Sequence, residues 1–253
     1  MTTGTLESTV ALVSGASSGI GRATAQHLAA AGATVALVAR RADRLEEVAA
    51  KLRADGHEAL VLASDLTDAA GAHDAVERTI REFGRLDTLV NAAGLMLNGP
   101  SDRSPLREWD QMVDINLRGL MYVTKAALPH LLAAAKDSPR SVADVVNISS
   151  VAGRFAAPTV AIYNATKFAV TGATEAWRQE YTTRNVRFSL IEPGRTQTEL
   201  FDQKSNSDSD FTAAFGEVEQ LHAEDIAEAV AYIVTNPRRV AVNEIVIRPT
   251  DQP

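Results

Sequence analysis

Residues 9–21 read TVALVSGASSGIG, a short β-branched run that passes directly into a glycine-rich turn. The first half is apolar and too short for a helix, so it predicts a buried strand. The second half turns at Gly15 and Gly19, and Gly21 opens a helix pattern. Glycine at such a junction lets the backbone approach a pyrophosphate, which then lies at the positive end of the helix. This stretch therefore predicts a strand, a phosphate-binding turn and a helix.

Three other residues of the turn belong to the same predicted site. Ser17 and Ser18 add hydroxyl donors, and Ile20 lies in the first turn of the helix. The spacing Gly-x3-Gly-x-Gly differs from the Gly-x-Gly-x-x-Gly of the commoner dinucleotide fingerprint. A plain tight turn is the alternative, but the position between a first strand and a first helix favours a dinucleotide site.

The alternation of strand and helix continues along the chain. Further short apolar runs lie at residues 34–39, 59–63, 86–91, 143–149, 186–191 and 243–248. Helix patterns lie at residues 21–31, 44–55, 69–83, 109–135, 161–183 and 224–235. Apolar runs without alternation are typical of parallel strands covered on both faces. The pattern predicts an α/β fold, a doubly wound Rossmann-type parallel sheet of about seven strands, with residues 1–253 as a single domain.

Composition and charge exclude several classes of function. The 253 residues contain no Cys, which excludes disulfides and thiolate metal sites, and a net charge of −7 argues against nucleic acid as a partner. The five histidines are scattered without metal-ligand spacing, so no metal is expected. No apolar run is long enough to span a membrane, and residues 1–9 lack a signal-peptide pattern. We expect a cytoplasmic protein with no membrane partner.

Arg40 and Arg41 follow the second predicted strand, about 20 residues past the turn. An NAD-preferring site places an acid there, on the ribose 2′-hydroxyl, but the first acid here is Asp43. A 2′-phosphate instead attracts planar, bidentate cations. The pair predicts NADPH/NADP⁺ as the cofactor, and ordinary surface arginines are the alternative.

A second group of residues predicts acid–base chemistry. Tyr163 and Lys167 are four apart in one helix pattern, so they share a face. An ammonium nearby favours the phenolate and lowers the tyrosine pKa. Ser150 follows the fifth strand, where its hydroxyl can hydrogen-bond a carbonyl oxygen that the tyrosine protonates, and Asn116 would complete a relay to Lys167 through water. Ser149 should point the other way, because side chains alternate along a strand.

These motifs together resemble the short-chain dehydrogenase/reductase family over almost the whole chain. The matching stretches are SGASSGIG (14–21), Asp65-Leu66, NAAG (91–94), DINLRG around Asn116, NISSVAG (147–153), YNATK (163–167) and EPGRTQT (192–198). The resemblance implies that Tyr163 is the general acid/base, Ser150 orients the carbonyl, Lys167 holds the nicotinamide ribose, and Asn116 anchors the relay water.

The resemblance also implies how a nicotinamide cofactor is held. Asp65 and Leu66 would contact the adenine, and Asn91 the adenine ribose. The remaining cofactor residues lie at Gly94 in the NAAG motif and at Pro193, Gly194, Thr196 and Thr198, which would hold the carboxamide. Two departures stand out, Ser14 for the usual Thr and Ala92 for the usual second Asn, and the second removes an amide that ties the central strands.

The substrate side is less defined. Residues 199–216 form a polar stretch with Phe at its edges, which predicts a substrate lid, with a solvated surface loop as the alternative. We expect Leu95, Met96, Val151, Phe155, Phe201 and Phe211 to line a mainly apolar pocket. A narrower resemblance is to the clavaldehyde dehydrogenase subgroup of bacterial NADPH-dependent carbonyl reductases. It is carried by ARRADRL (39–45), GLMYVTKAALPHLL (119–132), IEPGRTQTEL (191–200) and IRPTDQ (247–252).

The sequence thus favours an NADPH-dependent oxidoreductase acting on ketones or aldehydes, or in reverse on secondary alcohols or hydroxy acids. The resemblance implies a homodimer or homotetramer through the helices that carry Asn116 and Tyr163. Three alternatives stay open: a clavaldehyde-type aldehyde reductase of secondary metabolism, a non-catalytic dinucleotide sensor of the same fold, and an enzyme of dehydration or epimerisation.

Overall fold

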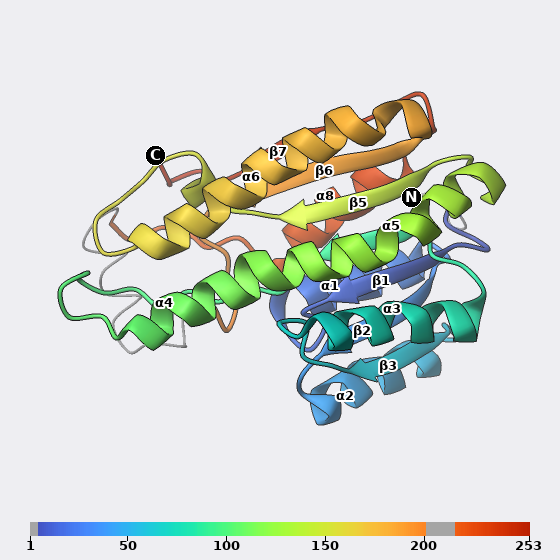
Figure 1. Cartoon of the computed structure of the whole chain (residues 1–253), viewed down its shortest axis with the longest axis horizontal. Coiled ribbons are helices and arrows are strands. Elements are labelled where there is room, and N and C mark those ends of the chain that lie inside the picture. Colours follow the sequence, from blue (N-terminus) through green and yellow to red (C-terminus); the bar gives the residue numbers. More distant parts are fainter. Residues whose placement is uncertain (1–4, 201–215) are drawn as a thin grey trace.

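The structure, a computed structural model, describes residues 5–200 and 216–253. Within these residues a sheet of seven strands has the order β3-β2-β1-β4-β5-β6-β7, and every neighbouring pair is parallel (Figure 1). The strands are β1 (Val10–Ser14), β2 (Thr34–Ala39), β3 (Ala59–Ala63), β4 (Thr88–Asn91), β5 (Ala143–Ile148), β6 (Val186–Pro193) and β7 (Glu244–Ile247). The predicted doubly wound, single-domain fold is confirmed, and each strand lies within two residues of its predicted bounds.

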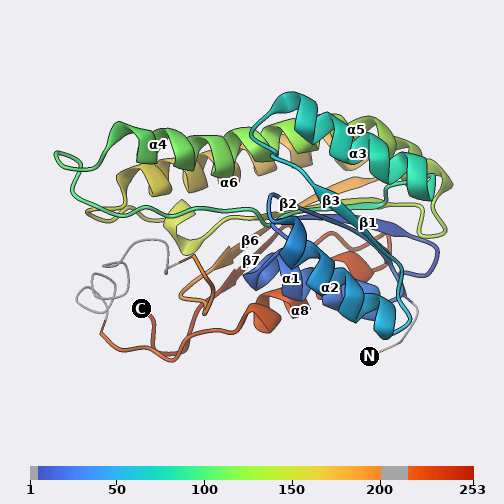
Figure 2. The ribbon, with the colours of Figure 1, turned by 90° about the horizontal axis from the view of Figure 1, so that it is seen from below.

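Helices cover both faces of the sheet, as Figure 2 shows. One face carries α1 (Gly19–Ala30), α2 (Ala42–Ala54) and α8 (Ala223–Thr235). The other carries α3 (Ala69–Phe83), α5 (Gly119–Asp137) and α6 (Ala161–Tyr181). The strand order reverses between β1 and β4, and open α/β sheets bind ligands in the crevice at such a reversal.

Burial follows the position of each strand in the sheet. All residues of β1, β4, β5 and β6 are buried between two apolar clusters, one on each face. The edge strand β7 alternates instead, and Val246 on its outer side is 37% exposed. The expectation of strands apolar on both faces is right for the centre of the sheet and wrong for β7, because only one neighbouring strand and fewer helices cover it.

Local chemistry explains several helix ends. Gly32 after α1 and Gly56 after α2 have φ of +103° and +86°, the left-handed backbone that glycine adopts without strain. Asp68 caps α3 by accepting from the N–H groups of Ala70 and Gly71. These three ends therefore follow from the residue types at the helix termini.

The single helix predicted at residues 109–135 is wrong in its start and in its continuity. The structure has α4 (Leu106–Val113), a π-helical turn at Asp114–Arg118 and then α5, in one continuous rod. A π-turn accommodates an extra residue in a helix and occurs often at functional sites. Asn116 lies within it. The i→i+5 pattern leaves no periodic signal in the sequence, so the interruption was not predicted.

No helix within residues 5–200 or 216–253 has the length and apolar character needed to cross a membrane.

A buried ion cluster joins β5 to β6. Asp144, whose side chain is 1% exposed, accepts from Nε and Nη2 of Arg187 at 2.6 and 2.9 Å and from Nη1 of Arg140 at 3.0 Å. Arg187 is itself buried and also donates to the carbonyl oxygens of Asn236 and Pro237. The cluster ties the segment after α8 to the sheet.

Removing the shared carboxylate should destabilise the fold. Asp144→Ala leaves two guanidinium groups without their counter-ion, and we expect the free energy of unfolding to fall by about 3 kcal/mol or more. The control is Glu175→Ala, which breaks an exposed pair with Arg178 and should leave the free energy of unfolding nearly unchanged. Urea denaturation measures both variants, and equal losses would contradict the assignment.

Candidate active site

A cavity of about 1020 Å³ opens at the carboxyl ends of the strands. This volume is at the upper end of the range for ligand pockets. The predicted residues in its wall are Gly15, Ser17, Ser18, Gly19, Ile20, Gly21, Arg40, Arg41, Asp65, Leu66, Asn91, Gly94, Ser150, Tyr163, Lys167, Pro193, Gly194, Thr196 and Thr198. Among the predicted catalytic and cofactor-binding residues, all of which the structure describes, Asn116 alone lies outside the wall.

The turn between β1 and α1 forms a cradle of bare backbone at one end of the cavity. Gly15 and Gly19 have positive φ, +68° and +48°. A Cβ on Gly21 would lie 2.4 Å from the Gly15 carbonyl oxygen, so no side chain fits there. Ser18 precedes α1 without a side-chain capping bond, and no acid occupies the first turn. The amino end of α1 therefore fits a phosphate group of a dinucleotide.

Arg41 lies across this cradle. Its Nη2 donates to the hydroxyls of Ser17 and Ser18 at 3.1 and 3.0 Å, and its Nη1 pairs with Glu199 at 2.9 Å. Burial acts to raise the pKa of Glu199, but the hydrogen bond and charge of Arg41 outweigh it and keep that pKa below its usual value. The cation is thus held at the phosphate end of the cavity, beside Arg40.

Asp65 and Asn91 lie farther along the wall. The hydroxyl and N–H of Thr67 donate to Asp65 at 2.7 and 3.0 Å, and they lower the pKa of that carboxyl. Asn91 is 3% exposed and turns its amide into the sheet, where it donates to Asn147 at 2.8 Å and to Thr124 at 3.1 Å. The Nδ2 of Asn91 therefore ties β4 to β5, and the expected contact of Asn91 with the adenine ribose stays a prediction.

Ser14 supports the same region. Its hydroxyl accepts from the N–H groups of Ala92 and Ala93 at 3.1 and 3.3 Å, so it joins the end of β1 to the segment after β4. The resemblance suggested that Ala92 removes an amide that ties the central strands. The Asn91–Asn147 bond and the Ser14 bonds fix these strands without it.

Tyr163, Lys167 and Ser150 come together on one wall. Tyr163 is 6% exposed and is hydrogen-bonded to the Ser150 side chain. The Lys167 Nζ donates to the carbonyl oxygen of Ile148 at 2.9 Å and lies 5.6 Å from the centre of the Tyr163 ring. The N–H of Ala152 donates to the Ser150 hydroxyl at 3.1 Å, which fixes the serine at the end of β5.

Burial controls the protonation of both titratable groups. It raises the pKa of Tyr163 to about 12, against a smaller lowering effect of the Ser150 hydrogen bond. It lowers the pKa of Lys167 to about 8. The expectation that Lys167 lowers the tyrosine pKa is not met in this structure, because desolvation of the phenolate dominates and the ammonium is turned toward the Ile148 carbonyl.

Ser149 faces away from Ser150. Its hydroxyl donates to the Lys167 carbonyl oxygen at 3.2 Å and lies 3.4 Å from the Thr171 hydroxyl, against α6. Strand alternation predicts this opposite orientation.

Asn116 fixes the backbone beside the site. Its Oδ1 accepts from the Leu95 N–H at 2.7 Å, and its Nδ2 donates to the Leu95 carbonyl oxygen at 2.8 Å and to the Thr166 hydroxyl at 3.1 Å. The side chain therefore clamps the segment after β4 to the helix of Tyr163. No direct hydrogen bond joins this side chain to Lys167 among the described residues, and the relay through water expected from the sequence stays a prediction.

The turn after β6 forms another part of the cavity wall. The Pro193 carbonyl oxygen accepts from Ser150 at 3.4 Å, and the Gly194 N–H donates to Ile247 at 2.7 Å. Gln252, a residue not predicted, lines the cavity and accepts from the Arg195 N–H at 2.8 Å. A Cβ on Gly194 would lie 2.4 Å from the same Gln252 oxygen, which explains the glycine. No spacing in the sequence links Gln252 to this turn.

The substrate end is apolar, as expected. Leu95, Met96, Val151 and Phe155 line the cavity, and Leu200 packs in the cluster around Tyr163. Phe201, Phe211 and most of the predicted lid, residues 201–215, lie outside the described residues. Among the described residues no group of three or more His, Asp or Glu side chains is placed to hold a metal ion.

Comparison with known proteins assigns the family. The protein-family model described as short chain dehydrogenase matches residues 9–209. The chain therefore belongs to this family. An uncharacterized oxidoreductase of Staphylococcus epidermidis is 36% identical over 240 residues, covering 95% of this chain and 96% of the relative. The narrower resemblance to clavaldehyde dehydrogenase stays a prediction.

Solved structures agree in fold. A metagenomic short-chain oxidoreductase in complex with NADP superposes with a TM-score of 0.81 at 31% identity, covering 97% of this chain and 99% of the other. A 3-ketoacyl-(acyl-carrier-protein) reductase from Brucella melitensis complexed with NADH gives a TM-score of 0.85 at 28% identity, with coverage of 97% and 99%.

Buried Lys167 should make stability depend on pH. Its pKa is about 8 in the folded protein against an ordinary 10.5, so between these values the unfolded chain binds more protons. The free energy of unfolding should therefore rise by about 2 kcal/mol between pH 8 and 10. Above pH 10 the raised pKa of Tyr163 acts in the opposite direction.

Lys167→Met removes the titrating group and should abolish this rise, whereas Lys51→Met on the exposed side of α2 should keep it. Urea denaturation at pH 8 and pH 10 gives the comparison. A rise of the same size in wild type and Lys167→Met would contradict the prediction.

Proposed function

We propose that the protein is an NADPH-dependent oxidoreductase that reduces the carbonyl group of a ketone or aldehyde, and in reverse oxidises a secondary alcohol or hydroxy acid. Family membership and the NADP- and NADH-bound relatives support NAD(P)-dependent oxidoreduction. The observation that carries the finer proposal is the hydrogen-bonded pair of Tyr163 and Ser150, with Lys167 beside it, in the wall of the large cavity.

The cofactor would be held along the whole wall. The bare backbone at Gly15, Gly19 and Gly21 fits a pyrophosphate, because side chains are excluded there and the amino end of α1 faces it. Asp65 and Leu66 would contact the adenine, and the turn from Pro193 to Thr198 would hold the carboxamide. Once bound, the nicotinamide supplies or accepts the hydride.

The chain's own part is proton transfer and orientation. With a pKa of about 12, Tyr163 is a phenol at neutral pH, which is the state that a proton donor to a carbonyl oxygen requires. The Ser150 hydroxyl, fixed by the Ala152 N–H, would orient the same oxygen. Lys167 would contact the cofactor ribose and return protons to the tyrosine. The apolar wall at Met96 and Phe155 keeps water from the reacting carbon.

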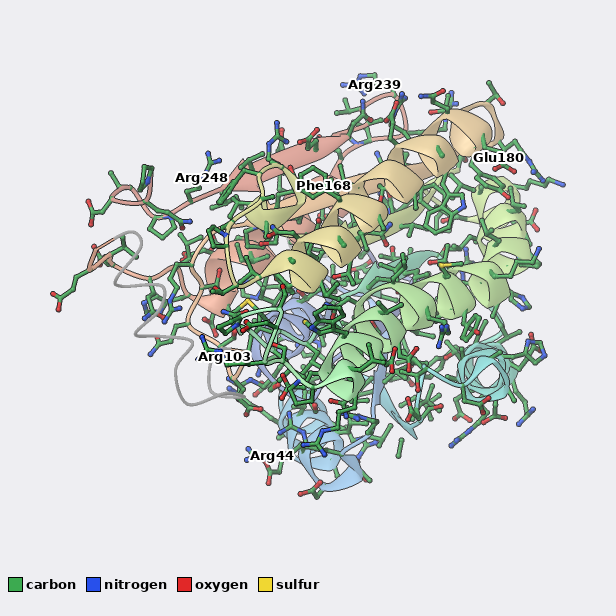
Figure 3. The ribbon with its side chains drawn as sticks, turned by 60° about the vertical axis from the view of Figure 1, so that its left-hand side comes forward. Arg44, Arg103, Phe168, Glu180, Arg239 and Arg248 are labelled. Carbon is green, nitrogen blue, oxygen red and sulfur yellow. The ribbon has the colours of Figure 1, made fainter. Side chains whose placement is uncertain are left out.

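An oligomer is part of the proposal. Met121 on α5 and Phe168 on α6 are each 44% exposed, and Figure 3 labels Phe168 on its helix. Large apolar side chains on two neighbouring helices support association through these helices into a homodimer or homotetramer. We also expect the protein to act in the cytoplasm.

Tyr163→Phe should lower kcat for carbonyl reduction by about 10²–10⁴-fold, because it removes the proton donor while keeping the ring. Tyr232→Phe on α8 is the matched control, since Tyr232 is 58% exposed and far from the cavity wall, and it should leave kcat unchanged. NADPH oxidation followed by absorbance gives the rates, and NADPH fluorescence shows whether the cofactor still binds.

A Tyr163→Phe variant with a tenth or more of wild-type kcat would refute the assigned role. A wild type that binds NADPH but reduces no ketone or aldehyde would instead favour the dinucleotide sensor.

Arg40 and Arg41 should determine the preference for NADPH. Asp at either position replaces a cation beside the cradle with an anion, so we expect the NADPH/NADH ratio of kcat/KM to fall about tenfold or more. Arg239→Asp makes the same charge change outside the cavity and should leave the ratio unchanged (Figure 3). Unaltered ratios in both Arg40→Asp and Arg41→Asp would show that another group selects the cofactor.

A further inference from the structure

Asn98 is a buried polar side chain without a hydrogen bond. It lies in the segment between β4 and α4, is 9% exposed and lines the cavity. Its Oδ1 is shielded from solvent and unpaired, and within the described residues its side-chain amide forms no hydrogen bond. Asn98 lies outside every motif described above.

Two other buried asparagines of the site use both ends of their amides, and Asn91 donates through its Nδ2 although its Oδ1 is unpaired. Asn116 uses both ends of its amide on Leu95 and Thr166. Asn164 donates to the carbonyl oxygens of Ala152 and Phe155 at 2.7 and 2.9 Å and accepts from the Ala157 N–H at 3.2 Å. Since an unbonded buried amide is destabilising, Asn98 needs a separate explanation.

The backbone on each side of Asn98 is fixed. The Leu97 N–H donates to the Met112 sulfur at 3.4 Å, and the Gly99 N–H donates to the Thr159 carbonyl oxygen at 2.8 Å. The second bond joins this segment to the loop that leads into the helix of Tyr163. Asn98 is therefore held against the same cavity as the proton donor, although no partner in the described residues uses its amide.

Apolar residues accompany Asn98 in the cavity wall. Met96 and Val160 line the cavity and belong to the cluster that contains Tyr163, and Leu97 next to Asn98 packs against the same cluster. The Asn98 amide can therefore form a hydrogen bond with a polar group of a bound molecule other than its reacting carbonyl. Because an amide both donates and accepts, a hydroxyl is a small neutral group that can pair with either end of it.

We propose that Asn98 determines substrate specificity by hydrogen-bonding a hydroxyl group of the substrate that is separate from the reacting carbonyl. The substrate class is then a hydroxy-ketone or hydroxy-aldehyde. This inference rests on the proposed carbonyl reduction and names the kind of molecule reduced. A site that is built to hydrogen-bond a substrate hydroxyl discriminates against the analogue that lacks it.

Matched ketones test the proposal. In each pair a hydroxyl replaces a terminal methyl group: hydroxyacetone against butanone, 4-hydroxybutan-2-one against pentan-2-one, and 5-hydroxypentan-2-one against hexan-2-one. We expect the wild type to prefer the hydroxyl member of at least one pair by about tenfold in kcat/KM, the size of one neutral hydrogen bond. Asn98→Leu and Asn98→Ala should reduce that preference to about one, and the exposed control Asn243→Leu should keep it.

A second measurement needs no substrate. If the Asn98 amide forms its hydrogen bond only with a ligand, it is unpaired in the free protein. Asn98→Leu then removes an unpaired polar group from an apolar wall and should raise the melting temperature by about 2–4 °C. A residue that stabilised the fold through its amide would give the opposite shift. A lower melting temperature of Asn98→Leu therefore overturns the inference.

The two proposals fail in different ways. A wild type that reduces ketones with equal kcat/KM within every pair, or a preference that Asn98→Leu leaves intact, overturns the role of Asn98 and leaves carbonyl reduction standing. A wild type that reduces none of the six ketones with NADPH or NADH overturns the proposed function itself.

Discussion

Backbone packs directly on backbone at the turn between β1 and α1, and the cavity depends on this close approach. A Cβ on Gly21 would lie 2.4 Å from the Gly15 carbonyl oxygen, and one on Gly15 would lie 2.8 Å from the Ala93 nitrogen. The Ser14 hydroxyl adds bonds from the N–H groups that follow β4. The turn before α1 is thereby fixed beside the segment that follows β4, at the reversal in strand order where parallel sheets form a crevice. The other walls are placed relative to this turn.

Burial has two effects at the opposite wall. It removes water from Tyr163 and Lys167, and it shifts their pKa values to about 12 and about 8 respectively, in each case toward the neutral form. A neutral phenol suits proton donation to a carbonyl, and a lysine that titrates near physiological pH can exchange protons readily. The hydrogen bond of Ser150 to Tyr163 and that of Lys167 to Ile148 hold both groups in place despite the cost of burial.

The sequence predicts the fold and most of the cavity wall because their signals are local: short apolar runs, helix periodicity, and glycines at turns. Spacing within one helix likewise predicts that Tyr163 and Lys167 share a face. The unpredicted features depend on tertiary contacts. Gln252 meets Arg195 across 57 residues, and Asn98 is a single polar residue in a loop. The direction of the tyrosine pKa shift also follows from burial, which no local pattern of residues specifies.

The π-helical turn at Asp114–Arg118 makes the rod from α4 to α5 sensitive to length. Deleting one residue there would let the turn relax to an ordinary helix and rotate everything before it by about 100° relative to α5. Met112 would then leave the cluster around Tyr163, and Trp109 would turn with it. Substitutions in this turn preserve the rotation of α4 relative to α5. Deleting a single codon would instead misalign the apolar cluster around Tyr163 while leaving every strand of the sheet intact.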